Sequence, residues 1–339
     1  MCCLARVVCG AALLLAVAQP AAAQLYESVG TRAKGMAGAF VAVADDATAT
    51  WWNPAGLATG ATLSALYERG EQTQPADPLD QGPASRLKPS AIAVAYPALG
   101  LSYYRLRISE IAAISPTGPP PADRQDLGAT PPFVRTLALQ QFGATFGQST
   151  GPIVLASTLK LVRGGVTRGL AAAHDPLDAA DDLDVESETH ADLDLGVMVN
   201  AGSLRGGFSI RNLRQPTFGS DDDERLELKR QARAGVAYLT ASRGGALDAL
   251  TVAADFDITT ASTLFGDVRH VATGAEAYFA KRHIGVRGGL QRNTVGEARP
   301  AYSYGFSVAP VTGLFLDFAR TKGKDETVEG WNAGVRLSF

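Results

Sequence analysis

WNAGVRLSF, the stretch at residues 331–339, alternates between side chains of two kinds. Every second residue from Trp331 to Phe339 is apolar or small, and the residues between them include Asn332 and Arg336. Because successive side chains of a β-strand point to opposite faces, this pattern predicts a strand with one apolar and one polar face. One face suits lipid and the other suits water.

Similar alternation recurs upstream in short runs that are separated by clusters of turn residues. We predict strands near residues 61–69, 90–96, 99–108, 133–147, 153–165, 190–201, 204–212, 230–240, 248–258, 270–280, 283–292, 301–309, 313–321 and 330–339. A soluble β-sandwich would show the same alternation, so periodicity alone does not decide the fold class.

The connections between these strands alternate between long and short along the chain. Long connections include 70–89 and 109–132, and short ones include 97–98 and 202–203. A bacterial outer-membrane barrel has an even number of antiparallel strands, short periplasmic turns and long external loops. We therefore predict an all-β fold, a transmembrane antiparallel β-barrel of about fourteen strands over residues 61–339, with both ends periplasmic.

The first residues indicate a secretory leader. Arg6 precedes an apolar run that is too short to span a bilayer as a helix, and residues 21–23 then supply an A-x-A site. We expect a signal peptide at 1–23, with cleavage near Ala23, and export to the outer membrane of a Gram-negative bacterium.

Composition excludes several classes of function. All three cysteines lie at positions 2, 3 and 9, so the mature chain has no disulfide, thiolate or cysteine metal site. Of 31 Lys+Arg only Arg6 is in the leader, which gives a mature balance of 30 − 34 = −4 and no basic footprint for a nucleic-acid partner. The mean hydropathy of +0.03 is too low for a helical membrane protein and fits a barrel.

Residues 24–60 differ in composition from both the leader and the strands. The stretch 30–58 reads GTRAKGMAGAFVAVADDATATWWNPAGLA and is rich in glycine and alanine. Asn53 followed by Pro54 favours a helix start, because asparagine caps free amides and proline fits the first helical position. We expect this segment to fit inside a larger structure, and we leave open whether its tryptophans are buried with it or lie in an interfacial girdle.

Charged residues on the predicted inward faces are candidates for the lumen, since a charge facing lipid at the midplane costs about 2–4 kcal/mol. They are Arg205, Arg211, Arg287, Arg336, Asp192, Asp194, Asp255, Asp257 and Asp317. Two interpretations remain open, a structural network of ion pairs and a substrate path that these charges line.

One strand shows an irregular pattern. The apolar phase in 99–108 shifts at Tyr103 and Tyr104, which predicts a β-bulge and a strand kink.

Motifs that would indicate catalysis or metal binding are weak. Residues 147–151, GQSTG, fit G-x-S-x-G, but that motif works on a strand-to-helix turn, and Pro152 and a β-branched run follow Ser149. The histidines have no metal-ligand spacing. Acidic runs at 175–188 and 221–224 favour solvated loops, with calcium binding as the alternative. We predict no enzyme activity, cofactor or metal.

The segment GMAGAF at 35–40, the run ADDA at 44–47 and WNPAGLA at 52–58 together carry a family resemblance. They resemble the N-terminal signature of the outer-membrane superfamily that contains the FadL-type fatty acid transporters and the PorV/PorQ proteins of type IX secretion. The terminal Phe339 is similar to the signal that the barrel-assembly machinery reads.

The resemblance implies a fourteen-stranded barrel whose N-terminal segment folds inward as a hatch. Carried over to this sequence, the hatch and gating residues are Asp45, Asp46, Trp52, Asn53, Pro54, Ala55 and Gly56. It also implies passive uptake of small hydrophobic, fatty-acid-like compounds through a barrel in outer-membrane lipids. The alternative is a PorV-like role in protein secretion, in which the partner is a secreted protein or a translocon.

Overall fold

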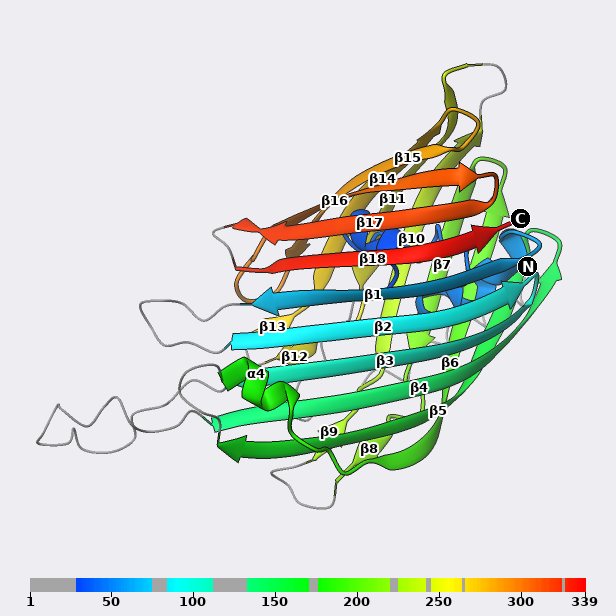
Figure 1. Ribbon diagram of the computed structural model, residues 1–339. Coiled ribbons are helices and arrows are strands. Elements are labelled where there is room, and N and C mark those ends of the chain that lie inside the picture. Colours follow the sequence, from blue (N-terminus) through cyan, green and yellow to red (C-terminus); the bar gives the residue numbers. More distant parts are fainter. Residues whose placement is uncertain are drawn as a thin grey trace, which may run out of the picture.

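The computed structural model describes residues 29–74, 84–111, 133–170, 176–219, 225–241, 245–263, 266–324 and 327–339. Fourteen antiparallel strands close into one barrel, as the sequence predicts (Figure 1). The barrel strands are β1 (Ser64–Gln74), β2 (Ala84–Tyr96), β3 (Leu99–Ile111), β4 (Phe133–Thr150), β5 (Ile153–Leu170), β6 (Glu188–Ala201), β7 (Leu204–Arg211), β10 (Gln231–Ala241), β11 (Leu247–Asp257), β14 (His270–Phe279), β15 (Ile284–Asn293), β16 (Ala301–Val311), β17 (Leu314–Gly323) and β18 (Glu329–Ser338).

Each barrel strand pairs with its neighbours in chain order, and β18 pairs with β1 to close the wall. At this seam the amide of Phe339 donates to the carbonyl of Leu63 at 3.0 Å, and the amide of Leu63 donates in return at 3.2 Å. Both ends of the barrel chain therefore lie on the side of the short connections, which is at the right in Figure 1.

The wall has an apolar outer face and a buried inner face. In β16, alternate residues from Ala301 to Ala309 are buried, while Tyr302, Tyr304 and Phe306 are exposed. Large exposed apolar side chains of this kind recur around the barrel, which is the surface that a lipid bilayer would cover. No helix within the described ranges is long and apolar enough to cross a membrane.

The predicted bulge at Tyr103 and Tyr104 is wrong. Tyr103 pairs with Ile92 and Phe142, Tyr104 pairs with Ala91 and Gln141, and both ladders continue without a shift. The apolar phase changes because the inner face of β3 becomes apolar toward the long loops, where Tyr104, Leu106 and Ile108 are buried in the lumen.

Short elements lie between the barrel strands. The hairpin β8 (Thr217–Phe218) and β9 (Leu226–Glu227) and the hairpin β12 (Ala261–Thr263) and β13 (Gly266–Val268) belong to long connections. Helix α4 (Pro176–Asp181) lies against the outer face of β3 and β4, where Ala180 and Val134 are buried together (Figure 1).

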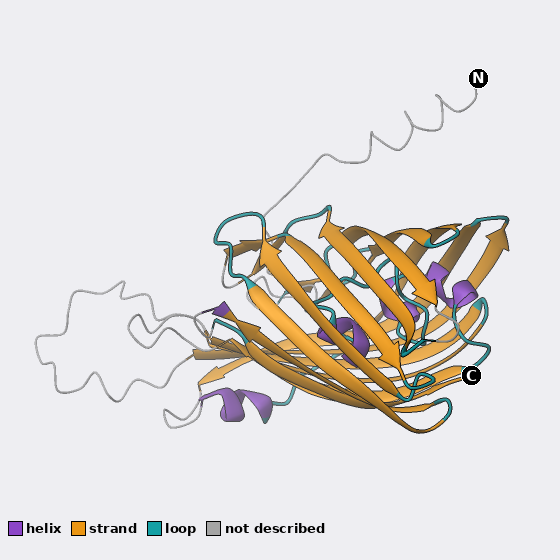
Figure 2. Cartoon of the chain, turned by 90° about the horizontal axis from the view of Figure 1, so that it is seen from above, coloured by secondary structure: helices purple, strands orange, loops and turns teal. Residues whose placement is uncertain are grey.

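Between Val29 and the barrel, the structure shows three helical turns: α2 (Thr31–Gly35), α3 (Ala49–Trp52) and the 3₁₀ helix η2 (Pro54–Thr59). α2 contacts β15 to β18, and η2 contacts β2 to β6, so the two touch opposite parts of the wall. Seen from above, helices lie within the ring of strands (Figure 2). The predicted signal peptide at 1–23 lies outside the described residues.

Candidate functional site

Residues 29–60, here called the lumenal segment, fill the interior of the barrel. From Val29 to Leu57 every residue is buried except Asp45, which is partly exposed. Small side chains make this close packing possible, since alanine and glycine let the segment's backbone approach the wall. The segment lies inside the barrel and does not extend out of it, and every residue of its WNPAG motif, 52–56, is buried.

A carboxylate of the first strand holds the start of the segment. Glu68 on β1 accepts hydrogen bonds from the amides of Gly30 at 2.6 Å and Thr31 at 2.7 Å. These amides begin α2 and have no partner within the helix, so a carboxylate here satisfies them and complements the helix dipole. Glu68 therefore fixes the entry of the chain into the lumen.

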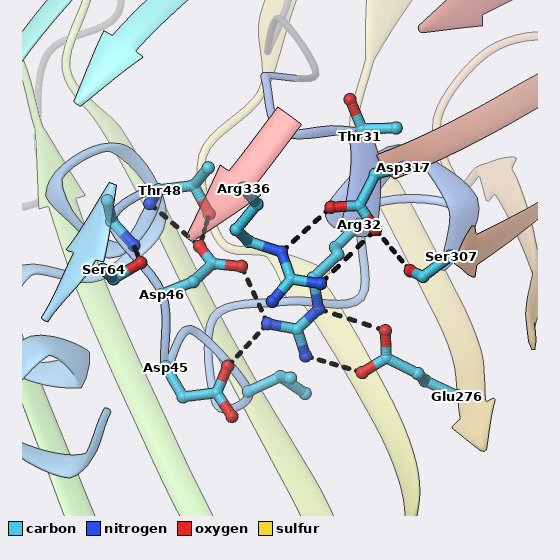
Figure 3. A network of polar contacts seen from close by, with 12 residues as sticks. Thr31, Arg32, Asp45, Asp46, Thr48, Ser64, Glu276, Ser307, Asp317 and Arg336 are labelled. Atoms are coloured by element: carbon cyan, nitrogen blue, oxygen red, sulfur yellow. Dashed lines mark hydrogen bonds and ion pairs between the residues drawn. The ribbon is translucent and has the colours of Figure 1, made fainter. Parts of the chain in front are cut away.

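Arg32 is the centre of a buried ion network (Figure 3). Its guanidinium binds both carboxylate oxygens of Glu276 on β14, at 2.6 and 3.0 Å, and reaches Asp45 and Asp46 at 2.7 Å each. Both aspartates thus bind an arginine of the same segment, and Asp46 also accepts a hydrogen bond from the amide of Thr48. These contacts tie the segment's beginning to its middle, and the Glu276 contact ties both to the wall.

A second cluster lies beside this network. Asp317 on β17 binds Arg336 at 2.9 Å, and Ser307 also donates to it (Figure 3). Asp317 also binds Arg287 at 3.1 Å. Arg287 lies 3.5 Å from Glu276, so the two clusters are continuous. Bidentate and branched arginine contacts of this kind fix geometry as well as charge.

Two further groups anchor the middle of the segment. Asp255 on β11 accepts hydrogen bonds from the amides of Phe40 and Val41, at 2.7 Å each. Asn53 donates to the carbonyl of Val41 and to that of Val197 on β6, at 3.0 Å each, and its own oxygen caps Ala55 at the start of η2. Asn53 thus joins two parts of the segment to the wall.

Glycines in the wall provide the space for the segment's backbone. A Cβ atom at Gly207 would lie 2.6 Å from the carbonyl oxygen of Val41, and one at Gly274 would lie 2.5 Å from that of Met36. Gly196 has the same role beside Asn53, with 2.2 Å to its side-chain oxygen. Within the segment, a Cβ at Gly56 would lie 1.8 Å from the carbonyl oxygen of Ala44, so this motif glycine is needed for close packing.

Both tryptophans of the segment lie inside the barrel, which settles the alternative left open by the sequence. The Trp52 ring nitrogen donates to the carbonyl of Val29 at 2.7 Å. Trp51 packs edge-on against Tyr104 with ring centroids 4.8 Å apart, and the Arg211 guanidinium lies 3.5 Å from the Trp51 ring centroid. Cation–π contact offsets the cost of burying this arginine.

Two cations of the segment have shifted pKa values. Burial alone would lower the pKa of Arg32, but the carboxylates of Glu276 and Asp45 raise it well above its usual value. Burial lowers the pKa of Lys34 to about 8, and Glu68 opposes the shift. The ammonium of Lys34 makes no hydrogen bond to any residue that the structure describes.

The upper lumen, toward the long loops, is apolar on one side. The inward faces of β2 to β5 carry a set of buried apolar side chains, here called the apolar stripe: Leu87, Tyr104, Leu106, Ile108, Leu137, Leu139, Val162 and Val166. The β8–β9 hairpin covers it with Phe218 and Leu226, which are fully buried in the same cluster. Inner faces of membrane barrels are usually polar, so this stripe requires an explanation.

At the other end a polar recess of about 400 Å³ opens between the segment and the short turns. Arg32, Asp45 and Arg336 line its inner side, and Lys281 and Phe339 line its rim. The ion network therefore lies between the recess and the packed interior.

The remaining charge candidates also face inward, but they have other partners. Lys160 binds Asp192 at 3.1 Å and Asp194 at 2.7 Å, and Arg233 binds Asp257 at 2.5 Å. Arg205 is partly buried and donates to the carbonyl of Val43 at 3.4 Å. Sequence reasoning missed Arg32, Glu68, Glu276 and Lys160, although the last three have the same inward parity as the residues that it chose.

Ser149 lies at the exposed end of β4, in a hairpin that leads directly into β5. The strand-to-helix turn that a nucleophile elbow needs is therefore not formed there. Within the described ranges, no three His, Cys, Asp or Glu residues gather as a metal site. The acidic run at 221–224 lies outside those ranges.

No curated protein is significantly similar to this chain in sequence. A family model described as "F plasmid transfer operon, TraF, protein" matches residues 134–257, from β4 into β11, which is less than half of the chain. Solved structures give the clearer comparison. A CymD monoaromatic hydrocarbon channel superposes with a TM-score of 0.58 at 12% identity, covering 92% of this chain and 98% of that chain.

Two further solved structures are similar to this chain over nearly the same length. A Pseudomonas aeruginosa FadL homologue gives a TM-score of 0.58 at 11% identity, covering 94% of this chain and 100% of that chain. The Ralstonia pickettii toluene transporter TbuX gives 0.56 at 14% identity, with coverages of 92% and 99%. At these identities the likeness shows a shared barrel fold, which confirms the FadL-type part of the sequence resemblance at the level of fold.

Proposed function

We propose that this chain is an outer-membrane channel for the passive uptake of small hydrophobic compounds. The observation that carries the proposal is the apolar stripe on the inward faces of β2 to β5. A lumen that passes water and ions has no use for eight buried apolar side chains on one wall, whereas an apolar solute needs such a surface to leave water.

The structures similar to this chain support this class of substrate. They are a monoaromatic hydrocarbon channel, a toluene transporter and a FadL homologue. Small aromatic compounds and fatty-acid-like compounds are therefore both candidates, and the uptake experiment compares them.

The lumenal segment acts as the hatch in this proposal. Its contacts with Glu68, Asp255 and Glu276 on three strands hold it across the lumen. Its apolar residues are buried in one cluster with apolar residues of the wall. The set of wall contacts that hold the lumenal segment is here called its seat. Passage then requires the β8–β9 hairpin to move away from the apolar stripe and the segment to leave its seat. The polar recess at the short-turn end gives the periplasmic exit.

Uptake by proteoliposomes tests the proposal. Vesicles that contain the protein are incubated with labelled toluene or a labelled fatty acid, and the trapped label is compared with that of empty vesicles. We expect faster uptake with the protein. Equal uptake by empty vesicles would overturn the proposal.

A matched pair of variants shows whether the stripe carries the solute. Leu139→Asn places an amide in the stripe, while Ala138→Asn places the same amide on the opposite face of β4. We expect slower uptake for Leu139→Asn and unchanged uptake for Ala138→Asn.

A secretion-accessory role is the second candidate, and the sealed lumen is the observation that favours it. A barrel that binds a secreted protein or a translocon at its surface can remain closed throughout. Copurification after gentle solubilisation separates the two proposals, because this role needs a stable protein partner and uptake does not. We likewise expect no enzymatic activity, and a Ser149→Ala protein that differs from wild type in any hydrolase assay would contradict that expectation.

A further inference from the structure

The outer wall changes abruptly from apolar to cationic on β1 to β3. Tyr67, Ile92 and Tyr103 lie side by side in one register row and face outward. The next outward positions along the same strands toward the long loops are Arg69, Ser90 and Arg105, which again form one row. Two residues of a strand rise by about 6.8 Å, so the boundary between apolar and charged surface is sharp.

One step further along, Lys88 and Arg107 lie directly opposite each other on β2 and β3. Like charges placed opposite each other across a sheet destabilise it unless an anion lies near them. With Arg69 and Arg105 they surround an outward-facing recess of about 370 Å³, which Tyr67 and Trp331 line on its apolar side.

The nearby carboxylates balance only part of this positive charge, because Asp181 pairs with Lys88 and only Glu71 among the carboxylates lines the recess. Glu71 lies 3.9 Å from Arg86, and Asp181 of α4 binds Arg86 and Lys88. Arg107 donates to the carbonyl of Leu183.

Arg69 and Arg105 remain without a counter-charge. Both are exposed and have neither an ion pair nor a hydrogen bond with any residue that the structure describes. The recess therefore carries uncompensated positive charge.

We propose that Arg69, Lys88, Arg105 and Arg107 form a binding site for the phosphate group of an anionic membrane lipid. Guanidinium groups bind phosphate through two parallel hydrogen bonds, and aromatic side chains such as Tyr67 and Trp331 lie preferentially at the level of lipid headgroups. The apolar row of Tyr67, Ile92 and Tyr103 lies directly beneath the cations, where the acyl chains of the same lipid would run.

That arrangement favours a lipid over free phosphate. A free anion needs the cations alone, whereas an amphiphile matches the cations and the apolar row together. The inference rests on the proposed membrane location and is independent of uptake.

Trp331 supplies the readout. It lines the recess and is 37% exposed, whereas Trp51 and Trp52, the other tryptophans of the chain, are 2% and 0% exposed in the lumen. The protein is reconstituted into phosphatidylcholine vesicles that contain a minority of a lipid with brominated acyl chains, which quench nearby tryptophan. The brominated lipid is either phosphatidic acid or phosphatidylcholine, and quenching by the two is compared.

We expect stronger quenching by brominated phosphatidic acid than by brominated phosphatidylcholine. The Arg69→Gln/Arg105→Gln double variant should lose that preference, on the order of fivefold for each arginine removed. Arg163→Gln is the matched control: Arg163 is exposed and opposite Gln140, which is itself opposite Arg105, so it lies in the same row outside the recess. It should keep the preference.

Equal quenching of the wild type by the two brominated lipids would overturn the inference, and so would a preference that survives in the double variant. Loss of the preference on addition of inorganic phosphate would show a site for free anions and would also overturn it. Absence of any quenching by brominated phosphatidylcholine would instead contradict the membrane location, so the two failures are distinguishable.

Discussion

Arg32 and Glu276 are 244 positions apart in the chain, yet they form a two-point ion pair at 2.6 and 3.0 Å in the interior of the barrel. The side chains are 7% and 2% exposed. A buried pair of this kind is weak evidence of net stabilisation, because desolvation opposes the Coulomb attraction. Its geometry does fix where the lumenal segment lies, so removing one partner leaves the other as an uncompensated buried charge.

Glu276→Gln should therefore loosen the lumenal segment. Breaking a buried pair costs about 3–5 kcal/mol, and Arg32 would keep only its two aspartates. We expect faster leakage of a small polar solute through proteoliposomes that contain the variant. Glu329→Gln is the control, since it removes an exposed partner of Arg320, and leakage should stay at the wild-type rate.

Gly207→Ala should displace the segment without a change in the outer wall. The new methyl group would lie 2.6 Å from the Val41 carbonyl oxygen and 2.9 Å from the Ala42 Cα, so backbone has to move. Overpacking of this kind costs about 1–3 kcal/mol. Limited proteolysis should cut residues 29–60 faster in this variant. Gly206→Ala, whose Cβ meets nothing within 4 Å, should leave the rate unchanged, and equal rates for all three proteins would refute the tight seat.

Asn53→Ala should destabilise the seat through lost hydrogen bonds. The carbonyls of Val41 and Val197 would lose their donor in a buried site, at a cost of about 1–3 kcal/mol. Urea titration followed by the fluorescence of the buried tryptophans should show a lower midpoint for the variant. An unchanged midpoint would mean that Asn53 does not hold the segment.

The lowered pKa of Lys34 gives the seat a pH dependence. Burial sets this pKa at about 8 in the seated segment, against about 10.4 for a hydrated lysine. Between pH 8 and about pH 10.4, Lys34 is more protonated in the released segment than in the seated one. The seated state therefore gains stability as the pH rises through this range. Below about pH 8 both states are protonated and this dependence ends.

Solute leakage measured between pH 7 and pH 10 checks this expectation. Leakage should fall as pH rises above 8, and Lys34→Met should remove that part of the pH profile and reduce leakage at pH 7. A profile that Lys34→Met leaves unchanged would show that another group is responsible.

The sequence predicts the barrel well because lipid and lumen impose opposite polarity on successive residues. All fourteen predicted strands form, and the β16 pattern from Ala301 to Ala309 shows why. The prediction fails at Tyr103 and Tyr104, where the inner face is apolar and the simple rule of apolar outside and polar inside no longer holds. The two-residue strands β8 and β9 are too short to leave any periodic signal.

The site is only partly readable from the sequence. Composition indicates that residues 24–60 pack inside something, and inward parity identifies Asp255 and Asp317 as lumen charges. The three-dimensional path of the segment decides which charged groups pair. The sequence around each residue therefore does not indicate that Arg32 pairs with Glu276 or that Glu68 accepts from the amide of Gly30. The need for glycine at these wall positions likewise becomes visible only when the segment's backbone is seen to lie against them.

The most direct test of the account is uptake through a barrel whose lumenal segment is locked. No cysteine occurs after Cys9, and a Cβ built at Gly35 lies 3.6 Å from the Cβ of Ala319 on β17, within the range of a disulfide. The same Cβ lies 2.5 Å from the side chain of Arg287, which has to move aside. The Gly35→Cys/Ala319→Cys protein, with the bond verified by mass, should take up labelled toluene or fatty acid no faster than empty vesicles until the bond is reduced. Gly35→Cys alone, which displaces Arg287 in the same way, should respond to neither oxidation nor reduction. Equal uptake by the oxidised and reduced double variant would contradict the proposal that the segment is a hatch.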